Sequence, residues 1–306
     1  MQEKIVKRKA YAKLNLTLDI VGQRDDGYHL LETLMQTFSL YDELEFFIKE
    51  IAGDSSENQI YLETLGLKID GEIEKNLCYR AAKIFFDEFN IKNKILNIKI
   101  NKKIPVGAGL GGGSSDCAQT IKFLAEEFGV TKEKQKIKDI CLKLGADVPF
   151  FIEGGFQKAG GIGEILTPIK RTFNYTIVLA KPEKSANTKE IYTLYDNHKI
   201  QTNYTINFLK SLNEKETAIL SQDSIIKTND KNIISHIGNC LQDVTYQICP
   251  EVNIINNKLL ELGAITACMT GSGTAVFGLF ENEGTAVKAE NEIKKITNFS
   301  GVYNFT

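Results

Sequence analysis

The sequence predicts an α+β protein with two domains, and three observations lead to this prediction. The 306 residues exceed what one hydrophobic core usually serves. The first half combines runs with the two-residue period of strands and runs with helical spacing around a glycine-rich loop. The last third gives strands and helices in an order that suits an antiparallel sheet backed by helices. We place the domain boundary after residue 168, so that the expected domains are 1–168 and 169–306.

Composition and charge exclude several classes of protein. Hydrophobic residues make up 42% and charged residues 25% of the chain, as in ordinary globular domains, and no apolar run reaches the length of a membrane span. The net charge of -2 argues against nucleic acid as the main partner. The opening segment lacks the apolar stretch of a secretory signal, so we expect a cytoplasmic protein. The six cysteines show no C-x-x-C spacing, which indicates neither zinc nor a disulfide framework.

The first elements are predicted as strands. Leu14, Leu16, Leu18 and Ile20 alternate with polar residues, and this period of two predicts a strand over 4–21. A turn follows at 24–27, and apolar runs through Leu40 and over 44–51 predict further strands. Residues 52–75 are polar and carry no clear pattern.

Helices enter in the next segment. Apolar residues at helical spacing predict a helix from Leu77 to about Phe89, with Asn76 at its N-cap. A strand over 95–100 leads into the glycine-rich loop, and helices are expected over 114–128 and 133–144. Residues 145–149 then read as a turn.

The second half restarts with a predicted strand over 175–180 and a helix near 189–195. Residues 201–232 are rich in polar residues and predict short surface helices and loops. A helix near 252–262, strands over 264–269 and 275–280, and a helix near 285–296 complete the predicted order.

The segment PVGAGLGGGSS, from Pro105 to Ser115, is the strongest functional signal. Glycines turn their amides inward without a Cβ clash, and a helical pattern begins directly after them, so we expect the loop to bind phosphate. Ser114 is placed to cap this helix. The alternative is a flexible turn, because the loop lacks the lysine that ends a Walker A motif.

Two charged residues are candidates for phosphoryl transfer. Asp147 precedes the apolar segment VPFFI and would accept the hydroxyl proton of an alcohol substrate; the alternative is a turn or capping aspartate. Lys13 lies on the first predicted strand and could hold Asp147 ionised, although most strand lysines face solvent.

Two further segments leave alternatives open. Residues 270–274 join two predicted strands and either present amides to a ligand or form a simple hairpin loop. Tyr28 and His29 could grip a planar base, whereas packing or surface exposure is the commoner fate of such residues.

Three ordered segments together resemble the GHMP family of small-molecule kinases. They are AKLNLTLDI near the start, PVGAGLGGGSSD in the middle and TGSGTAVFGLF near the end. The segments GQRDDGYHLLETLMQTFSLYDEL, GADVPFF and GIGEILTP are similar to those of family members that act on a cytidylated methylerythritol. The resemblance implies the two-domain GHMP kinase fold, with an N-terminal nucleotide-binding α/β domain and a ferredoxin-like C-terminal antiparallel sheet with helices.

The activity that the resemblance implies is ATP-dependent phosphorylation of the 2-hydroxyl of a cytidine diphosphate methylerythritol in the non-mevalonate isoprenoid precursor pathway, with magnesium accompanying the nucleotide. The alternatives are a GHMP kinase for another small alcohol, such as mevalonate or homoserine, and a non-catalytic nucleotide-binding module.

The resemblance also implies the roles of individual residues. Asp147 matches the general base and Lys13 its electrostatic partner, and the substrate contacts would be Asn15, Tyr28, His29, Thr188 and Tyr192. ATP would be bound by Pro105, Val106, Gly107, Ala108, Gly109, Leu110, Gly111, Gly112, Gly113, Ser114 and Ser115, with Asn76 near the adenine.

Overall fold

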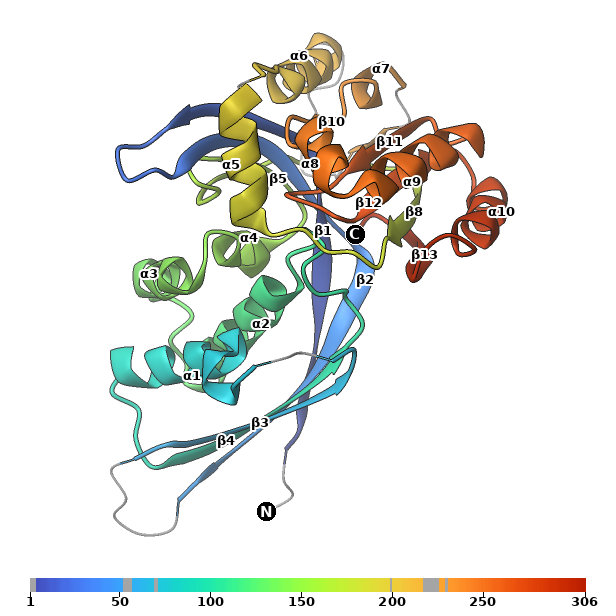
Figure 1. Ribbon diagram of the computed structural model, residues 1–306. Coiled ribbons are helices and arrows are strands. Elements are labelled where there is room, and N and C mark those ends of the chain that lie inside the picture. Colours follow the sequence, from blue (N-terminus) through green and yellow to red (C-terminus); the bar gives the residue numbers. More distant parts are fainter. Residues whose placement is uncertain (1–3, 52–56, 69–70, 199, 217–225, 229–230) are drawn as a thin grey trace. The chain divides into compact units, whose positions relative to one another are not determined.

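The computed structural model describes residues 4–51, 57–68, 71–198, 200–216, 226–228 and 231–306 (Figure 1). These residues form two compact units, and each unit is built from three separate segments of the chain. Unit 1 comprises Met1–Ala12, Leu40–Val106 and Gly111–Glu153, and unit 2 comprises Lys13–Ser39, Gly107–Leu110 and Gly154–Thr306. The expected domain boundary after residue 168 stays a prediction. Within the described residues, no helix is both long and apolar enough to cross a membrane.

Unit 1 is a layer of strands covered by helices. The last part of β2 (His29–Glu50) runs antiparallel to β4 (Lys94–Lys102), with Glu43 opposite Asn101, and β3 (Gln59–Gly66) runs parallel to β4. The helical elements are η1 (Ile73–Lys75), α1 (Leu77–Glu88), α2 (Gly112–Glu127), α3 (Lys134–Leu144) and α4 (Val148–Glu153). Phe46 of β2 stacks on Phe123 of α2, with ring centroids 4.5 Å apart, so the inward side chains of the sheet form a core with the helices.

Unit 2 contains a second sheet of four antiparallel strands in the order β11-β12-β8-β13. These are β8 (Thr176–Lys181), β11 (Thr266–Met269), β12 (Val276–Phe280) and β13 (Phe299–Asn304), and the helices α9 (Pro250–Glu261) and α10 (Glu283–Ile293) pack against them. The strands of this sheet and the helices packed on them, β8, α9, β11, β12, α10 and β13, follow the β-α-β-β-α-β succession of a ferredoxin-like arrangement, with further elements between β8 and α9. The predicted α+β class and its C-terminal antiparallel sheet are therefore confirmed.

The rest of unit 2 surrounds parts of β1 (Val6–Gln23) and β2. Thr17 and Leu18 of β1 pair with β10 (Gly238–Asn239), and residues 33–36 of β2 pair with β5 (Phe156–Gly160), which continues to β6 (Ile165–Pro168). The remaining elements are β7 (Arg171–Phe173), β9 (Ile226–Thr228), α5 (Thr188–His198), α6 (Tyr204–Glu216), α7 (Lys231–Ile234) and α8 (Gln242–Ile248).

Several element boundaries differ from those predicted. Residues 29–50 form one strand, because Asp42, which interrupts the apolar pattern, is buried in an ion pair instead of ending the strand. Residues 148–153 form the short helix α4, although the sequence predicts a turn over 145–149. The strands β3, β5, β6, β7, β9, β10 and β13 and the helices η1, α7 and α8 were not predicted, because their sequences are short or polar enough to resemble loops.

Candidate functional site

Lys13 is buried on β1 and its side chain is held by a neighbour on the same strand. It is 4% exposed, and its Nζ donates to Asn15 Oδ1. The Asn15 amide in turn donates to Thr33 Oγ1 at 2.8 Å, and the Asn15 backbone donates to Thr270 Oγ1 at 2.8 Å. Asn15 thus fixes the position of the Lys13 ammonium, and the alternative of a solvated strand lysine is wrong.

The first half of the glycine-rich loop lies against the late segment Thr270–Thr274. Lys13 N donates to Leu110 O at 3.0 Å, and Ala275 N donates to Ala108 O at 3.3 Å. A Cβ on Gly109 would lie 2.2 Å from Thr270 O, so only glycine fits at this approach. Three segments far apart in the sequence, around residues 13, 109 and 271, therefore meet within unit 2.

Thr188 at the start of α5 also reaches this late segment. Its Oγ1 lies 2.9 Å from Ser272 Oγ, and Asn239 Nδ2 donates to Met269 O and Gly271 O from the other side of the chain. These bonds fix residues 269–272 in position. Asn239 was not recognised from the sequence, where a single asparagine carries no signal.

The second half of the loop forms the start of α2 in unit 1. Gly111 is the N-cap residue with φ 70°, in the left-handed region, and Gly112 already belongs to the helix. The expectation that Ser114 caps this helix is wrong, because a left-handed glycine lets the helix begin earlier. Ser115 N makes the helical bond to Gly111 O, so the amides of residues 112–114 lie at the helix end, where anions are stabilised.

A buried triad of charges joins the strand before the loop to the helix after it. Lys102 Nζ lies 2.5 Å from Asp42 Oδ2 and 2.7 Å from Asp116 Oδ2, and the three side chains are at most 4% exposed. Asp42 Oδ1 also accepts the backbone N–H groups of Lys103 and Ile104. The triad therefore links β2 and the end of β4, before the loop, to the second turn of α2, after the loop.

Burial changes the protonation of this triad. Burial raises the pKa of Asp116 to about 8, and Lys102 only partly opposes that shift. Burial disfavours the Lys102 ammonium, but the two carboxylates outweigh burial and the pKa of Lys102 is raised. Two oxygens beside the loop, Ser115 Oγ and Asp116 Oδ1, are buried without a hydrogen-bond partner among the described residues.

Asp147 and Asn76 belong to unit 1. Asp147 is half-buried and directly precedes α4, whose Phe150 and Phe151 are buried. Asn76 is the N-cap of α1, where its side chain accepts the Cys78 N–H at 2.9 Å, and this predicted cap is confirmed. Because Lys13 belongs to unit 2, its pairing with Asp147 stays a prediction, as does the placement of Asn76 near adenine.

The predicted base-binding residues meet at a cavity of about 710 Å³ in unit 2. Its lining includes Tyr28, His29 and Tyr192, together with Ile162 and Thr188. His29 and Tyr192 stack with centroids 4.8 Å apart and an interplanar angle of 28°. Tyr28 is 61% exposed at the cavity, so it has room to turn toward a ligand.

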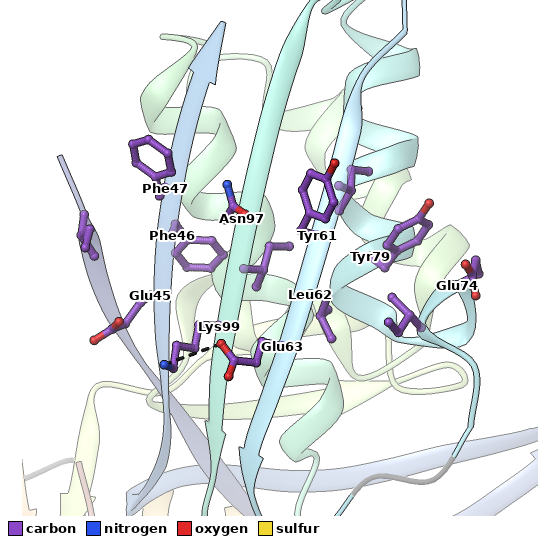
Figure 2. Close-up of a pocket in the computed structure, with 14 residues that line it drawn as sticks. Glu45, Phe46, Phe47, Tyr61, Leu62, Glu63, Glu74, Tyr79, Asn97 and Lys99 are labelled. Carbon is purple, nitrogen blue, oxygen red and sulfur yellow. Dashed lines mark ion pairs between the residues drawn. The ribbon is translucent and has the colours of Figure 1, made fainter. Parts of the chain in front are cut away.

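A second cavity of about 530 Å³ lies in unit 1, over β2, β3, β4 and the start of α1 (Figure 2). Its lining includes Tyr61, Tyr79 and Phe47, together with Lys99 and Glu63, which form an ion pair at 3.6 Å. Among the residues described, its lining includes no member of the glycine-rich loop. The cavity is therefore separate from the predicted phosphate site.

Sequence reasoning missed the triad and Asp196, which binds His29. Asp42 and Lys102 stand at buried positions of their strands, and Asp116, the fifth residue of α2, has buried neighbours on its helix. A buried charge usually has a charged partner, so the charged residues at these positions were the signal from which the triad could have been predicted. Asp196 follows Tyr192 by four residues on α5, which places both on one helix face.

Comparison with known proteins gives consistent matches along the chain. The GHMP kinases N terminal domain matches residues 76–155, and the GHMP kinases C terminal domain matches residues 224–297. A 4-diphosphocytidyl-2-C-methyl-D-erythritol kinase of Clostridium botulinum is 40% identical over 276 residues, covering 90% of each chain. One from Clostridium perfringens is 39% identical over 302 residues, covering 97% of this chain and 96% of its own.

The structure is also similar to a solved crystal structure. A crystal structure of 4-(cytidine 5'-diphospho)-2C-methyl-D-erythritol kinase superposes with a TM-score of 0.74 and 27% sequence identity, covering 98% of this chain and 99% of that chain. The similarity therefore extends over both units.

Proposed function

The chain belongs to the GHMP kinase family, and on that premise we propose that it transfers the γ-phosphoryl group of ATP to the 2-hydroxyl of 4-diphosphocytidyl-2-C-methyl-D-erythritol. The products are the 2-phosphate of the substrate and ADP. The family resemblance inferred from the sequence motifs is confirmed. The reaction belongs to the non-mevalonate pathway of isoprenoid precursors.

The observation that carries the choice of acceptor is the cavity around His29 and Tyr192. Mevalonate and homoserine have no base, and a kinase for either would need no aromatic surface beside its acceptor site. The 710 Å³ cavity provides such a surface and continues to Thr188, whose hydroxyl contacts the late glycine segment. This arrangement favours a cytidylated acceptor.

The glycine-rich loop is proposed to bind the phosphates of ATP. The amides at the start of α2 and the positive end of its helix dipole favour the negative charge that accumulates on the phosphates. The charge triad supports this role, because it fixes the segments on both sides of the loop.

Asp147 is proposed as the general base and Lys13 as its electrostatic partner. As the substrate 2-hydroxyl oxygen attacks the γ-phosphorus, its proton passes to the Asp147 carboxylate and the bond to the β-phosphate oxygen breaks. Lys13 suits a role beside developing negative charge, because Asn15 holds its ammonium in a buried position.

Magnesium is proposed to accompany ATP and to neutralise charge on the β- and γ-phosphates. No cluster of three or more potential ligands occurs among the described histidine, cysteine and acidic residues. This suits an ion held mainly by phosphates and water. Ser115 Oγ, in the first turn of α2 and without a hydrogen-bond partner among the described residues, is a protein oxygen that would hold such an ion. A cytoplasmic location stays a prediction.

The reaction is tested by ADP release with ATP and magnesium, comparing 4-diphosphocytidyl-2-C-methyl-D-erythritol, mevalonate and homoserine as acceptors. We expect turnover with the cytidylated acceptor alone. Turnover with another acceptor would overturn the substrate and keep the kinase, whereas ATP binding without any turnover would favour the non-catalytic module.

The base is tested with Asp147→Asn. The substitution preserves volume but cannot take up the proton, so we expect turnover to fall on the order of a hundredfold or more with ATP affinity retained. Glu153→Gln, at the other end of α4, is the matched control. An unchanged rate in Asp147→Asn would remove Asp147 from the role of base.

A further inference from the structure

One nitrogen of the His29 imidazole is committed to a carboxylate. His29 Nε2 lies 2.7 Å from Asp196 Oδ1, and the His29 side chain is only 10% exposed. Asp196 comes from α5, which lies alongside the beginning of β2 (Figure 1). An ionised carboxylate can only accept a hydrogen bond, so the proton of this contact belongs to His29 Nε2.

The aromatic neighbours of His29 leave one polar atom for a ligand. Tyr192 stacks on the imidazole, and Tyr195 meets it edge-on with an interplanar angle of 87°. The Tyr195 hydroxyl is engaged elsewhere, because it donates to Ile200 O at 2.9 Å. In a neutral imidazole protonated at Nε2, Nδ1 carries a lone pair and acts as an acceptor.

We propose that Asp196 is a positioning residue that makes the enzyme prefer cytosine to uracil, by holding His29 as the Nε2–H tautomer. This inference rests on the proposed function, in which His29 lines the base cavity. Cytosine presents an amino group at N4, which donates to an acceptor nitrogen. Uracil presents an oxygen at the same place, which would face the lone pair of Nδ1.

Without the carboxylate, the imidazole is free to exchange its proton between the two nitrogens. The Nδ1–H tautomer would donate to the uracil oxygen, so the site would accept both bases. Two buried acceptors that face each other lose the hydrogen bond of both, which corresponds to a discrimination of roughly five- to a hundredfold. Loss of Asp196 is expected to remove most of that factor.

The kinetic test compares the cytidine diphosphate acceptor with its uridine diphosphate analogue. In Asp196→Ala we expect the ratio of kcat/KM values for the two acceptors to fall roughly five- to a hundredfold, through KM and not through kcat. Glu190→Ala is the matched control, because it removes an exposed carboxylate from the same helix and should keep the ratio of the unmodified enzyme. An unchanged ratio in Asp196→Ala would overturn the proposal.

A spectroscopic test does not depend on turnover. Nitrogen-15 NMR of the imidazoles distinguishes the two tautomers, and with three histidines in the chain the signal of His29 is assigned by its loss in His29→Asn. We expect the Nε2–H tautomer in the unmodified protein and a mixture in Asp196→Ala. An Nδ1–H tautomer in the unmodified protein would contradict the proposal even if the variant failed to fold.

Failure of the proposed function can be distinguished from failure of this inference, because binding of the base can be measured without phosphorylation. If no acceptor is phosphorylated, binding of CDP and UDP to the same variants, measured by calorimetry, still decides whether Asp196 sets the base preference. Equal affinity of the unmodified protein for CDP and UDP would overturn the base preference itself.

Discussion

At the scale of single residues, the carboxylates of this protein differ in what surrounds them. Asp196 is 38% exposed and faces an imidazole, whereas Asp116 is buried between Lys102 and an apolar helix face. Burial in the second case favours the neutral carboxyl, although an ammonium lies 2.7 Å away, because Lys102 already serves Asp42. A buried group of two carboxylates and one ammonium therefore tends to retain a proton.

The raised pKa of Asp116 predicts how the free energy of unfolding depends on pH. Burial raises the pKa of Asp116 to about 8 in the folded state, while an unfolded aspartate has a pKa near 4. Between these values the folded protein binds a proton that the unfolded chain releases. The contribution of Asp116 to the free energy of unfolding is therefore present at low pH and is lost as the pH rises toward 8.

Denaturant unfolding at several pH values checks this prediction. Asp116→Asn removes the titrating group, so its free energy of unfolding should fall less than that of the unmodified protein between about pH 5 and about pH 8. Glu127→Gln, an exposed change on the same helix, should follow the unmodified protein. Parallel curves for all three proteins would mean that Asp116 is ionised throughout this range.

At the scale of elements, the start of α2 depends on the conformation of one glycine. Gly111 has φ 70°, a value that L-residues with a Cβ adopt at a cost of about 1–2 kcal/mol. This conformation begins the helix at Gly112 and brings its first amides to the helix end. Gly111 therefore determines the conformation of the glycine-rich loop at the start of α2, and its role is not to make the loop flexible.

Gly111→Ala should lower both stability and ATP affinity. We expect about 1–2 kcal/mol of destabilisation and a weaker ATP complex, measured by denaturation and calorimetry. Gly129, just beyond the C-terminal end of α2, has φ 68°, and a Cβ at this position would face open space, so Gly129→Ala carries the same backbone strain away from the loop. If both variants lost ATP affinity equally, the effect would come from stability and not from the loop.

The periodicity of apolar residues predicted most of the regular elements. Several of the remaining elements are stabilised by pairing with segments far away in the sequence. The alternation of β1 and the Asn76 cap of α1 are local properties, and both could be read directly. The polar strand β3 is stabilised by its parallel pairing with β4, and β13 by its antiparallel pairing with β8. Neither pairing can be inferred from the sequence of the strand alone. In the candidate site the same distinction applies: loop and motif residues were found, but Asp42, Lys102 and Asp196 act through distant partners.

At the scale of the whole molecule, every cysteine is in the interior. All six are free and buried, and burial raises the pKa of the Cys117 thiol well above its ordinary value. Cys117 is the sixth residue of α2, beyond the first turn whose free amides would favour a thiolate, and desolvation favours its thiol form. All six thiols are therefore packed in the interior.

Thiol titration gives a simple check. In the native protein, Ellman's reagent should modify the thiols only slowly, and after unfolding in denaturant all six should react rapidly. ATP should slow the native reaction further if it stabilises the folded state. Rapid modification of Cys117 in the native protein would instead indicate a reactive thiol beside the loop.

The pairing between residues 36–39 and 304–306 sets the order of events when the protein is synthesised. Phe38 forms a β-bridge with Phe305, Thr306 N donates to Thr37 O, and Asn304 N donates to Ser39 Oγ. The segment that completes this part of unit 2 thus emerges from the ribosome about 270 residues after its partner, a span that the Gln36–Thr306 hydrogen bond defines. Until then, residues 37–39 lack these partners, although β5 can already pair with residues 33–36, and an unpaired stretch of strand edge favours association between chains.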